Sequence, residues 1–472
     1  MREARHPTPA LAAAFAVVMS LAGCSFIPVY QRPDLPVPPS LSVAVDPSAL
    51  PAGMDAVPAA DLAWADFLGD ARLRALVELA LKNNRDLRIA TLNVELVRAQ
   101  LGVQRADLLP GVGAGLQASS TPVAGSNTRV YTAGLQVSNF ELDLFGRVRS
   151  LSEAAAARYL ASDEGRRAAQ VALVASVANV ELALRADDDL LRITRRTLDS
   201  RAEGLELTRV RFDGGVVAAP ELRVAESLLA AARANVLALE RQRAQDLNAL
   251  MLLLGQPVPA DLPAAPELSA SSLRALPAAM PSEVLLQRPD IRQAEQLLMA
   301  ANANIGAARA AFFPRIALTG SVGFASNELQ GLFDNTAWSF TGQLLQPLFD
   351  AGRNQANLEA AQVSRALAVA QYERAVQQAF REVADALAGR ATLGQQLKAQ
   401  QDQAEAETRR LELAELLFQG GAASGLDRLD AERSALAARQ AVVQVQLAQL
   451  QNDVLLYRVL GGGAGPGLAG TP

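Results

Sequence analysis

Side chains that could perform covalent or acid–base chemistry are few in this chain of 472 residues. The only histidine is His6 and the only cysteine is Cys24, both near the N-terminus. A Ser-His-Asp site, a Cys-His site or a zinc site of His and Cys ligands therefore cannot form in the body of the chain. Paired carboxylates could still serve an envelope hydrolase, but no such pair can be assigned to a cleft. The composition argues against an enzyme and indicates no metal and no cofactor.

Cys24 is instead placed for lipid attachment. Two arginines precede an apolar run at residues 11–21, which is too short to span a bilayer permanently and is typical of a signal peptide. The sequence Leu21-Ala22-Gly23-Cys24 resembles the bacterial lipobox, in which the cysteine is acylated after cleavage. We therefore predict that residues 1–23 are removed and that Cys24 carries a covalent lipid, with Ser25 favouring delivery to the outer membrane. A plain secretory signal with an incidental cysteine is the alternative.

The body of the chain contains two copies of one pattern. Asp86 and Pro110 recur 204 residues later as Asp290 and Pro314, and Gly146 recurs 206 residues later. A period of this length indicates a duplicated domain rather than a solenoid, and the slip of two residues indicates a difference in loop length. The predicted organisation is a signal peptide (1–23), a lipidated tether (24–69), a first structural repeat (70–255), a connection (256–289), a second structural repeat (290–461) and a flexible tail (462–472).

Four segments of about ten residues alternate between apolar residues and small or polar residues, two in each copy. The predicted strands cover about residues 111–119, 129–140, 315–326 and 336–348. A half-buried hairpin packed on a helix would show the same alternation. The length favours tilted transmembrane strands with their apolar side chains facing lipid.

Four such strands cannot close a barrel alone. An open sheet edge in lipid leaves backbone groups without partners, at a cost of several kcal/mol each. Strands of several chains must therefore combine, which requires an oligomer but does not give the number of chains.

Helical patterns occupy most of the remaining sequence. Residues 70–81 predict a short amphipathic helix with Leu73, Leu76, Val77 and Ala80 on one face. After each strand pair come roughly 100 residues of helical pattern with heptad spacing, which indicates coiled-coil packing. We predict that these helices reverse at Ala186–Asp189 and at Ala388–Gly394. The Gly-Gly pairs at 214–215 and 420–421 predict tight or left-handed joints midway along the helices.

Several motifs together resemble the bacterial outer membrane factors, the TolC-like exit ducts, and among them the lipoprotein branch of multidrug efflux systems. The motifs are Arg288-Pro289-Asp290-Ile291, Ile305-Gly306, Phe312-Phe313-Pro314, Pro347-Leu348-Phe349-Asp350 with Gly352-Arg353, Glu141-Leu142-Asp143-Leu144-Phe145-Gly146-Arg147, Phe380-Arg381-Glu382-Val383-Ala384-Asp385 and Leu460-Gly461-Gly462-Gly463. The resemblance covers nearly the whole chain from Cys24 to Gly463.

The resemblance implies a mainly α fold with a transmembrane β-barrel. Three chains would form a twelve-stranded barrel, continued by an α-helical barrel in the periplasm. An equatorial belt would be built from the N-terminal helix, the connection between the copies and the C-terminal end. The implied function is an outer-membrane exit duct that passively conducts drugs and toxic compounds from a tripartite pump. The implied partners are two further copies of the chain, a periplasmic adaptor protein, an inner-membrane efflux transporter and outer membrane lipids.

The resemblance also implies a periplasmic gate at the tips of the helix hairpins. With the reversals predicted at Ala186–Asp189 and Ala388–Gly394, the residues at or near the tips are the gate candidates. They are Asp187, Asp188, Asp189, Asp385, Arg390 and Asp402. A ring of aspartates at a constriction selects for cations, and contacts between aspartate and arginine of neighbouring chains would hold the gate shut. Solvated charges near helix ends are the simpler interpretation of the same residues.

Two other functions stay open at this point. A type I protein-secretion duct shares the fold and differs in partner and cargo, and a coiled-coil structural envelope lipoprotein would use the same long helices without membrane strands. Nucleic acid is not an expected partner, because the net charge of −5 and the pI of about 5.3 give no basic surface.

Overall fold

The computed structural model describes residues 25–38, 62–123, 126–268, 273–274, 276 and 282–463. Cys24 and the predicted signal peptide lie outside these residues. The chain divides into two compact units, and each unit takes segments from both copies of the repeated pattern. Unit 1 consists of Met1–Leu35, Thr91–Glu164 and Arg292–Ala375, and unit 2 consists of Pro36–Ala90, Gly165–Ile291 and Val376–Pro472.

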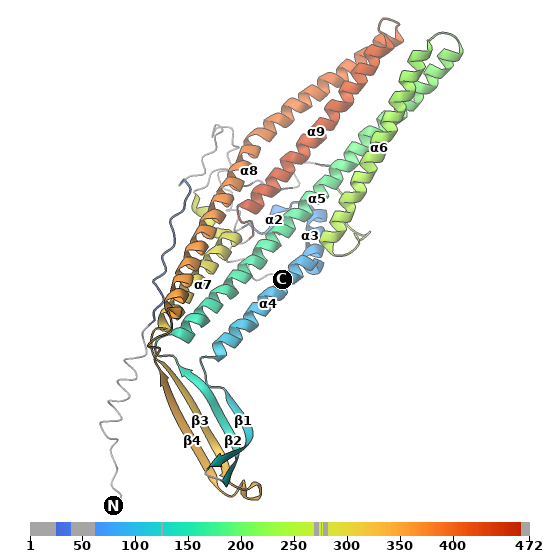
Figure 1. Cartoon of the computed structure of the whole chain (residues 1–472). Coiled ribbons are helices and arrows are strands. Elements are labelled where there is room, and N and C mark those ends of the chain that lie inside the picture. The colour runs from blue at the N-terminus through green and yellow to red at the C-terminus, as the bar shows by residue number, and fades with distance from the viewer. Residues whose placement is uncertain are drawn as a thin grey trace, which may run out of the picture. The chain divides into compact units, whose positions relative to one another are not determined.

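Unit 1 contains a four-stranded antiparallel sheet (Figure 1). Its strands follow the order of the sequence, β1 (Val112–Val123), β2 (Ser126–Leu142), β3 (Arg315–Ser326) and β4 (Thr336–Leu345). The prediction of four strands is confirmed, although the first hairpin is longer than predicted because pairing continues to Val123 and Ser126. β2 pairs with β3 and so joins the two copies, which leaves β1 and β4 as the two edges of the sheet.

The register gives the sheet one apolar face and one face of small and polar residues. Directly paired residues lie on the same face of an antiparallel sheet. One row across all four strands is Ala114, Leu135, Val322 and Trp338, and the adjacent row on the other face is Gly113, Gln136, Ser321 and Ser339. The predicted alternation is therefore confirmed.

A β-bulge in β2 keeps this alternation in register. Val137 pairs with Gly320 and Phe140 pairs with Leu318, so β2 contains one extra residue between these pairs. Asn139, in the bulge, has a left-handed φ of 54° and donates its backbone N–H to Oγ1 of Thr319 over 3.2 Å. If these residues paired regularly without the bulge, Phe140 would lie opposite Ala317 on the polar face, because a shift of one residue reverses every side chain. The bulge was not predicted.

Helical segments of four long helices complete unit 1. They come from α4 (Arg85–Ala106), α5 (Arg147–Asp213), α7 (Pro289–Ala310) and α8 (Arg353–Gln419). The remaining residues of α5 and α8 belong to unit 2. The repeated pattern is visible in the lengths, because α4 and α7 each have 22 residues and α5 and α8 each have 67.

Unit 2 contains two helix hairpins and a short buried helix. One hairpin is formed by α5 and α6 (Ala219–Leu254), and the other by α8 and α9 (Gly425–Val459). The short helices α2 (Trp64–Phe67) and α3 (Ala71–Asn83) precede the first hairpin in the chain. The 3-10 helix η3 (Ser282–Gln287) lies between the two hairpins in the chain. The second short 3-10 helix, η4 (Leu329–Gly331), lies between β3 and β4. The predicted amphipathic helix is confirmed as α3, which Asp70 caps by accepting from the N–H of Arg72. Its predicted apolar face, Leu73, Leu76, Val77 and Ala80, is fully buried.

The predicted reversals at Ala186–Asp189 and Ala388–Gly394 are wrong. Both segments lie inside continuous helices, α5 and α8. A run of alanine and aspartate lowers helix propensity by only a few tenths of a kcal/mol per residue, and neither segment contains a proline. Gly389 has a packing role instead, since a Cβ there would lie 2.3 Å from Oδ1 of Asn452.

The helices reverse instead at the Gly-Gly pairs, which were predicted as joints midway along them. Gly215 and Gly421 have left-handed φ values of 71° and 73°, as predicted for tight joints. The next residue in each turn donates its N–H backwards over 2.8 Å, Val216 to the carbonyl of Arg211 and Ala422 to that of Leu417. The two copies therefore use the same chain reversal.

Candidate functional site

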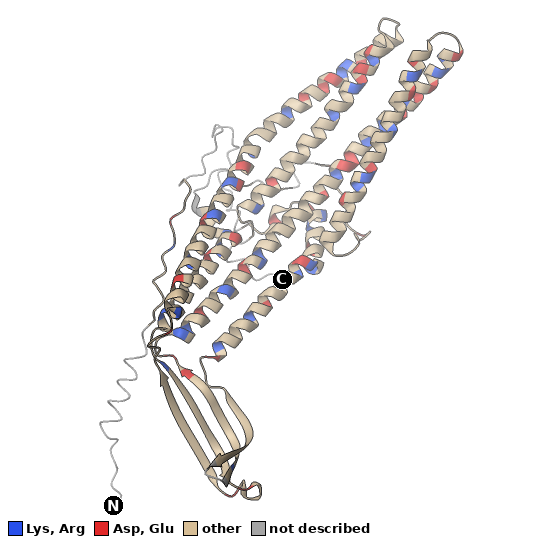
Figure 2. Cartoon of the chain, viewed as in Figure 1, with Lys and Arg blue, Asp and Glu red and all other residues tan. Residues whose placement is uncertain are grey.

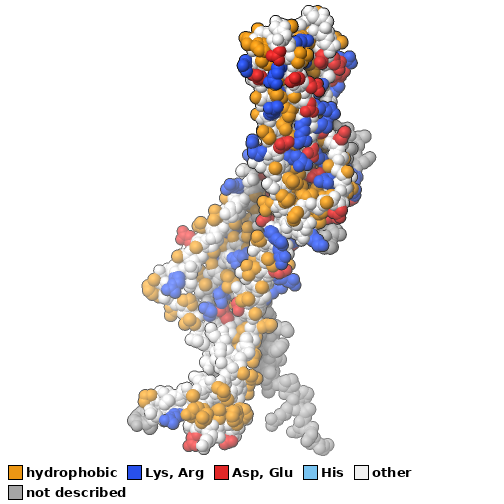
Figure 3. Space-filling view, turned by 90° about the vertical axis from the view of Figure 1, so that its right-hand side faces the viewer, with side chains coloured by type: hydrophobic (Ala, Val, Ile, Leu, Met, Phe, Trp, Pro, Cys, Tyr) orange, Lys and Arg blue, Asp and Glu red, His pale blue; other side chains and the backbone are white. Residues whose placement is uncertain are grey.

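The apolar face of the sheet is exposed in the single chain. Leu116 of β1 is 79% exposed, and Trp338 and Phe340 of β4 are 80% and 67% exposed. Hydrophobic side chains gather over the strands, at the bottom of the view in Figure 3. Exposed apolar area of this kind marks a surface that another apolar phase covers. Strands of ten to seventeen residues are long enough to cross a bilayer.

Charged residues are nearly absent from the strands, which are almost entirely tan in Figure 2. β1 and β4 contain none, and the others contain only Arg129, Glu141 and Arg315. Arg129 lies towards the hairpin end of β2, and the other two lie at the opposite end of the sheet. The middle of the sheet therefore carries no charge, as a membrane requires.

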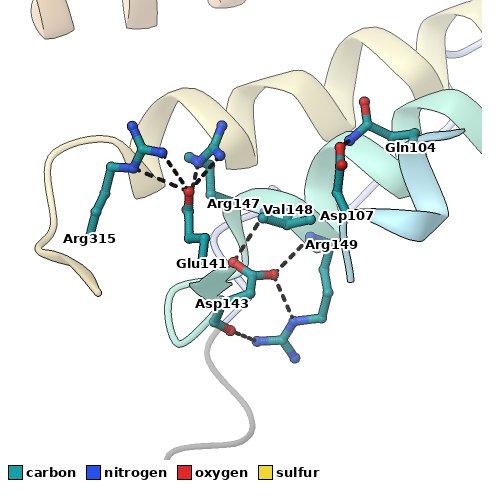
Figure 4. Close-up of polar contacts among 8 residues, drawn as sticks. All are labelled: Gln104, Asp107, Glu141, Asp143, Arg147, Val148, Arg149 and Arg315. Carbon is teal, nitrogen blue, oxygen red and sulfur yellow. Dashed lines mark hydrogen bonds and ion pairs between the residues drawn. The ribbon is translucent and has the colours of Figure 1, made fainter. Parts of the chain in front are cut away.

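Glu141 joins the strands to the helix that follows them (Figure 4). Its carboxylate accepts from Nε and Nη2 of Arg147, over 2.8 and 2.7 Å, and from Nη2 of Arg315 over 2.7 Å. Asp143 accepts from the backbone N–H groups of Val148 and Arg149 and so caps the first turn of α5. These contacts fix the direction of α5 relative to β2 and β3 at one end of the apolar face.

The N-terminal segment is held at the same end of the sheet. Phe26 stacks on Phe313 with ring centroids 4.7 Å apart, and Phe145 stacks on Phe313 at 4.9 Å. The carbonyl of Phe26 accepts from Nη1 of Arg309 over 3.3 Å. Since Phe313 lies two residues before β3, the residues directly after Cys24 are fixed next to the base of the strands.

A second set of contacts holds the same segment along α7. Arg32 makes two hydrogen bonds, of 2.7 and 3.1 Å, with the carboxylate of Glu295, and the hydroxyl of Tyr30 donates to it over 3.0 Å. Gly306 leaves room for Ile27, because a Cβ on this glycine would lie 2.5 Å from Cγ1 of Ile27. The segment is thus fixed at several points over its described length.

The ends of the helix hairpins also expose apolar side chains. Several leucines and valines within about two turns of each reversal are at least 46% exposed: Leu207, Val210, Val216 and Val224 in the first hairpin, and Leu413, Leu416, Leu417 and Leu426 in the second. Ser424 and Asp427 form a capping box at the start of α9. The hairpin ends are therefore well-defined structures with uncovered apolar surface.

The structure places Asp187 inside α5, away from any reversal. Asp213, where α5 ends, follows Asp189 after roughly 36 Å of helix. Asp187 is buried and lies close to the carboxyl group of Asp246 on α6. Burial, the charge and hydrogen bond of Asp246 and the charge of Asp188 raise the pKa of Asp187 to about 7.

The two neighbouring aspartates have basic partners in the same chain. Asp188 accepts from Nε of Arg243 on α6 over 2.6 Å, and Asp189 accepts from Nη2 of Arg192 over 2.6 Å. Their charges are therefore partly compensated.

Asp246 and Arg243 were not predicted from the sequence as partners of these aspartates. Their spacing of three residues shows that they share a face of α6, but not that α5 presents its aspartates to that face.

The other three gate candidates lie on α8. Asp385 is exposed, Arg390 is half-buried and attracted to Asp453 of α9, and Asp402 accepts from Lys398 over 2.7 Å. Lys398 lies on α8 and Asp453 on α9, whereas the partners described for the α5 aspartates lie on α5 and α6. The predicted position at hairpin tips is therefore wrong, while the gating role of the six residues stays a prediction.

Comparisons with known proteins agree with this geometry. Residues 76–256 and 280–462 match the family model described as outer membrane efflux protein. The chain is 43% identical over 453 residues to the probable efflux pump outer membrane protein TtgC of Pseudomonas putida, covering 94% of this chain and 93% of the relative. It is 41% identical over 460 residues to the cation efflux system protein CusC of Escherichia coli O157:H7, covering 95% and 98%. The solved open state of the MtrE outer membrane channel of Neisseria gonorrhoeae matches with a TM-score of 0.85 at 40% identity, covering 93% of this chain and 99% of that chain.

Proposed function

The chain belongs to the outer membrane efflux protein family, and from this premise we propose that three copies of it close one exit duct. It is the outer-membrane channel component of an efflux pump and not an enzyme. We further propose that the chain forms a homotrimer, carries a lipid anchor and conducts passively, with a periplasmic adaptor and an inner-membrane transporter as partners.

The sheet carries the proposal of a closed oligomer. Its apolar face is exposed, its middle is uncharged, and its edge strands β1 and β4 have no neighbour on their outer sides in the described chain. In lipid these edges must pair with strands of other copies. Three copies would give a twelve-stranded barrel with the face of small and polar residues lining water. A coiled-coil envelope lipoprotein predicts no such alternation and does not fit the sheet.

The mechanism is passive conduction. The interior face of the sheet offers hydroxyl, amide and glycine groups, such as Gln136, Ser321 and Ser339, and no described group there is placed to react with cargo. Small molecules, including drugs and toxic compounds, would pass through as solutes. The energy would come from an inner-membrane transporter linked through a periplasmic adaptor, for which the exposed apolar hairpin ends are a suitable contact surface.

A lipid on Cys24 would hold each copy at the membrane surface. Phe26 is fixed beside Phe313 at the base of β3, so an acyl chain two residues earlier could reach the lipid that surrounds the strands. The barrel itself anchors the protein, and the lipid adds a second anchor near the periplasmic side.

The test uses full-length protein purified in mild detergent. We expect a protein mass of three chains in native mass spectrometry and discrete current steps in planar lipid bilayers, and protein dissociated by heating serves as the silent control. A single-chain mass together with silent bilayers would contradict the duct. A three-chain mass with silent bilayers would retain the oligomer and show that the closed duct does not conduct.

A further inference from the structure

The two helix hairpins of unit 2 enclose a pocket of about 350 Å³ near their reversals. Its walls come from α5 and α6 on one side and from α8 and α9 on the other. Volumes of this size accommodate small organic ligands. Leu205, Leu228 and Leu429 supply part of an apolar lining.

A buried arginine with an unused donor lines this pocket. The side chain of Arg201 is only 8% exposed, and its Nε pairs with Oε1 of Glu432 over 3.3 Å. Its Nη1 atom is buried and has no hydrogen-bond partner. Burial is the main cause that lowers the pKa of Arg201, and repulsion from Arg428 and Arg433 lowers it further. The attraction of Glu432 raises the pKa but does not offset these effects. A buried cationic donor without an acceptor is costly unless an acceptor is supplied from elsewhere.

Two further arginines give the pocket an excess of positive charge. The guanidinium carbons of Arg211 and Arg428 lie 5.6 and 5.2 Å from the centre of the Phe418 ring. The Nε atom of Arg428 is also buried without a hydrogen-bond partner. With Arg201 these make three cationic side chains in the lining, against the two carboxylates of Glu221 and Glu432.

We propose that this pocket binds a small amphipathic monoanion, a carboxylate carried on an apolar body. The single excess charge and the free donors of Arg201 and Arg428 match one carboxylate, which accepts hydrogen bonds at both oxygens. The leucines and the Phe418 ring cover the apolar body. A more highly charged ligand would leave its other charges against this apolar lining, and a cation would be repelled.

The bound anion would contact both hairpins and therefore stabilise them against separation. This property belongs to the folded hairpins and is independent of conduction, so a duct that proves silent in bilayers would leave the binding prediction intact.

The test uses octanoate as probe and octanol as its neutral match, titrated calorimetrically into the full-length protein held in amphipol. We expect saturable octanoate binding at one site per chain, at least tenfold tighter than any octanol binding. Arg201→Gln should weaken octanoate at least tenfold. Arg428→Gln should also weaken octanoate binding at least tenfold. It leaves the Arg201–Glu432 pair in place, so it tests the proposal even if Arg201→Gln folds poorly.

The matched control is Arg223→Gln, which removes an arginine of α6 that pairs with Glu226 and does not line the pocket. It should leave octanoate affinity unchanged. Arg428→Lys should recover part of the affinity, because it restores the charge with fewer donors. Absence of saturable octanoate binding, equal affinity for octanol, or full binding by both glutamine variants would overturn the proposal.

Discussion

Gly134 of β2 and Gly323 of β3 are direct partners in the sheet, and neither has room for a Cβ atom. A Cβ on Gly134 would lie 2.4 Å from the carbonyl oxygen of Val322, and one on Gly323 would lie 2.1 Å from that of Ala133. The row continues with Gly115 and Ala337, so small residues cross the whole sheet on its polar face. Backbones that approach this closely on one face are a feature of a sheet curved towards that face.

Gly134→Ala should therefore impair barrel assembly. The added methyl must displace backbone in two strands, which typically costs about 1–3 kcal/mol. We expect a lower thermal midpoint of the assembled protein and a smaller fraction of oligomer on unheated gels. Gly113→Ala is the control, because a Cβ at Gly113 has no atom within 4 Å. Equal midpoints for the two variants would show that the close approach has no role in assembly.

The two faces of β4 should respond oppositely to charge. Phe340→Arg places a cation on the lipid face, at a cost of about 2–4 kcal/mol near the midplane. We expect loss of the oligomer from outer membrane fractions. Thr341→Arg, on the neighbouring position and the opposite face, should assemble and shift ion selectivity towards anions. Normal insertion of Phe340→Arg would contradict the assignment of the faces.

The reversal between α8 and α9 depends on one glycine of the pair. Gly421→Ala forces a side chain into a left-handed φ of 73°, which costs about 1–2 kcal/mol. Gly420→Ala should be neutral, since its Cβ would meet the nearest atom, the carbonyl oxygen of Leu416, at 3.4 Å. Hydrogen exchange of the hairpin end measures the difference. Faster exchange in Gly420→Ala than in Gly421→Ala would reverse the assignment.

Stability should fall as pH rises through the titration of Asp187. Its pKa is raised from 3.8 to about 7, so between these values the folded protein holds a proton that the unfolded chain has released. Asp187→Asn removes this penalty. The variant should exceed the parent in thermal midpoint above pH 7, and the difference should vanish below pH 4. Asp188→Asn, which removes a partner of Arg243 instead, should not gain stability at high pH. A pH-independent effect of Asp187→Asn would exclude the linkage.

A gate held by contacts between neighbouring copies can be distinguished from contacts within one chain. Asp385 is exposed, whereas Arg390 is attracted to Asp453 of the same chain. If Asp385 contacts a neighbouring copy, Asp385→Ala should raise the closed-state conductance in planar bilayers. If Arg390 acts only through Asp453, then Arg390→Ala and Asp453→Ala should have equal effects and the double variant no larger one. Unchanged conductance and selectivity in all three variants would end the gate proposal for these residues.

The sequence alone determined the features that depend on local periodicity. The alternation of residues 315–326 assigns every side chain to a face, because successive side chains of a strand point to opposite sides. The spacing of Leu73, Leu76, Val77 and Ala80 defines the buried face of α3 in the same way. The lack of histidine and cysteine in the body of the chain excluded several catalytic sites without any structure.

Only the tertiary structure decided the features that depend on contacts between distant residues. A break at Ala186–Asp189 and a break at Gly214-Gly215 are both compatible with the sequence. The helix reverses at the glycine pair, where Gly215 adopts a positive φ and lets the hairpin pack. The bulge at Asn139 depends on the register with β3. The raised pKa of Asp187 arises because packing removes it from water and brings Asp246 from α6 against it. The free donor of Arg201 arises because packing buries Nη1, while Glu432 of α9 pairs with Nε.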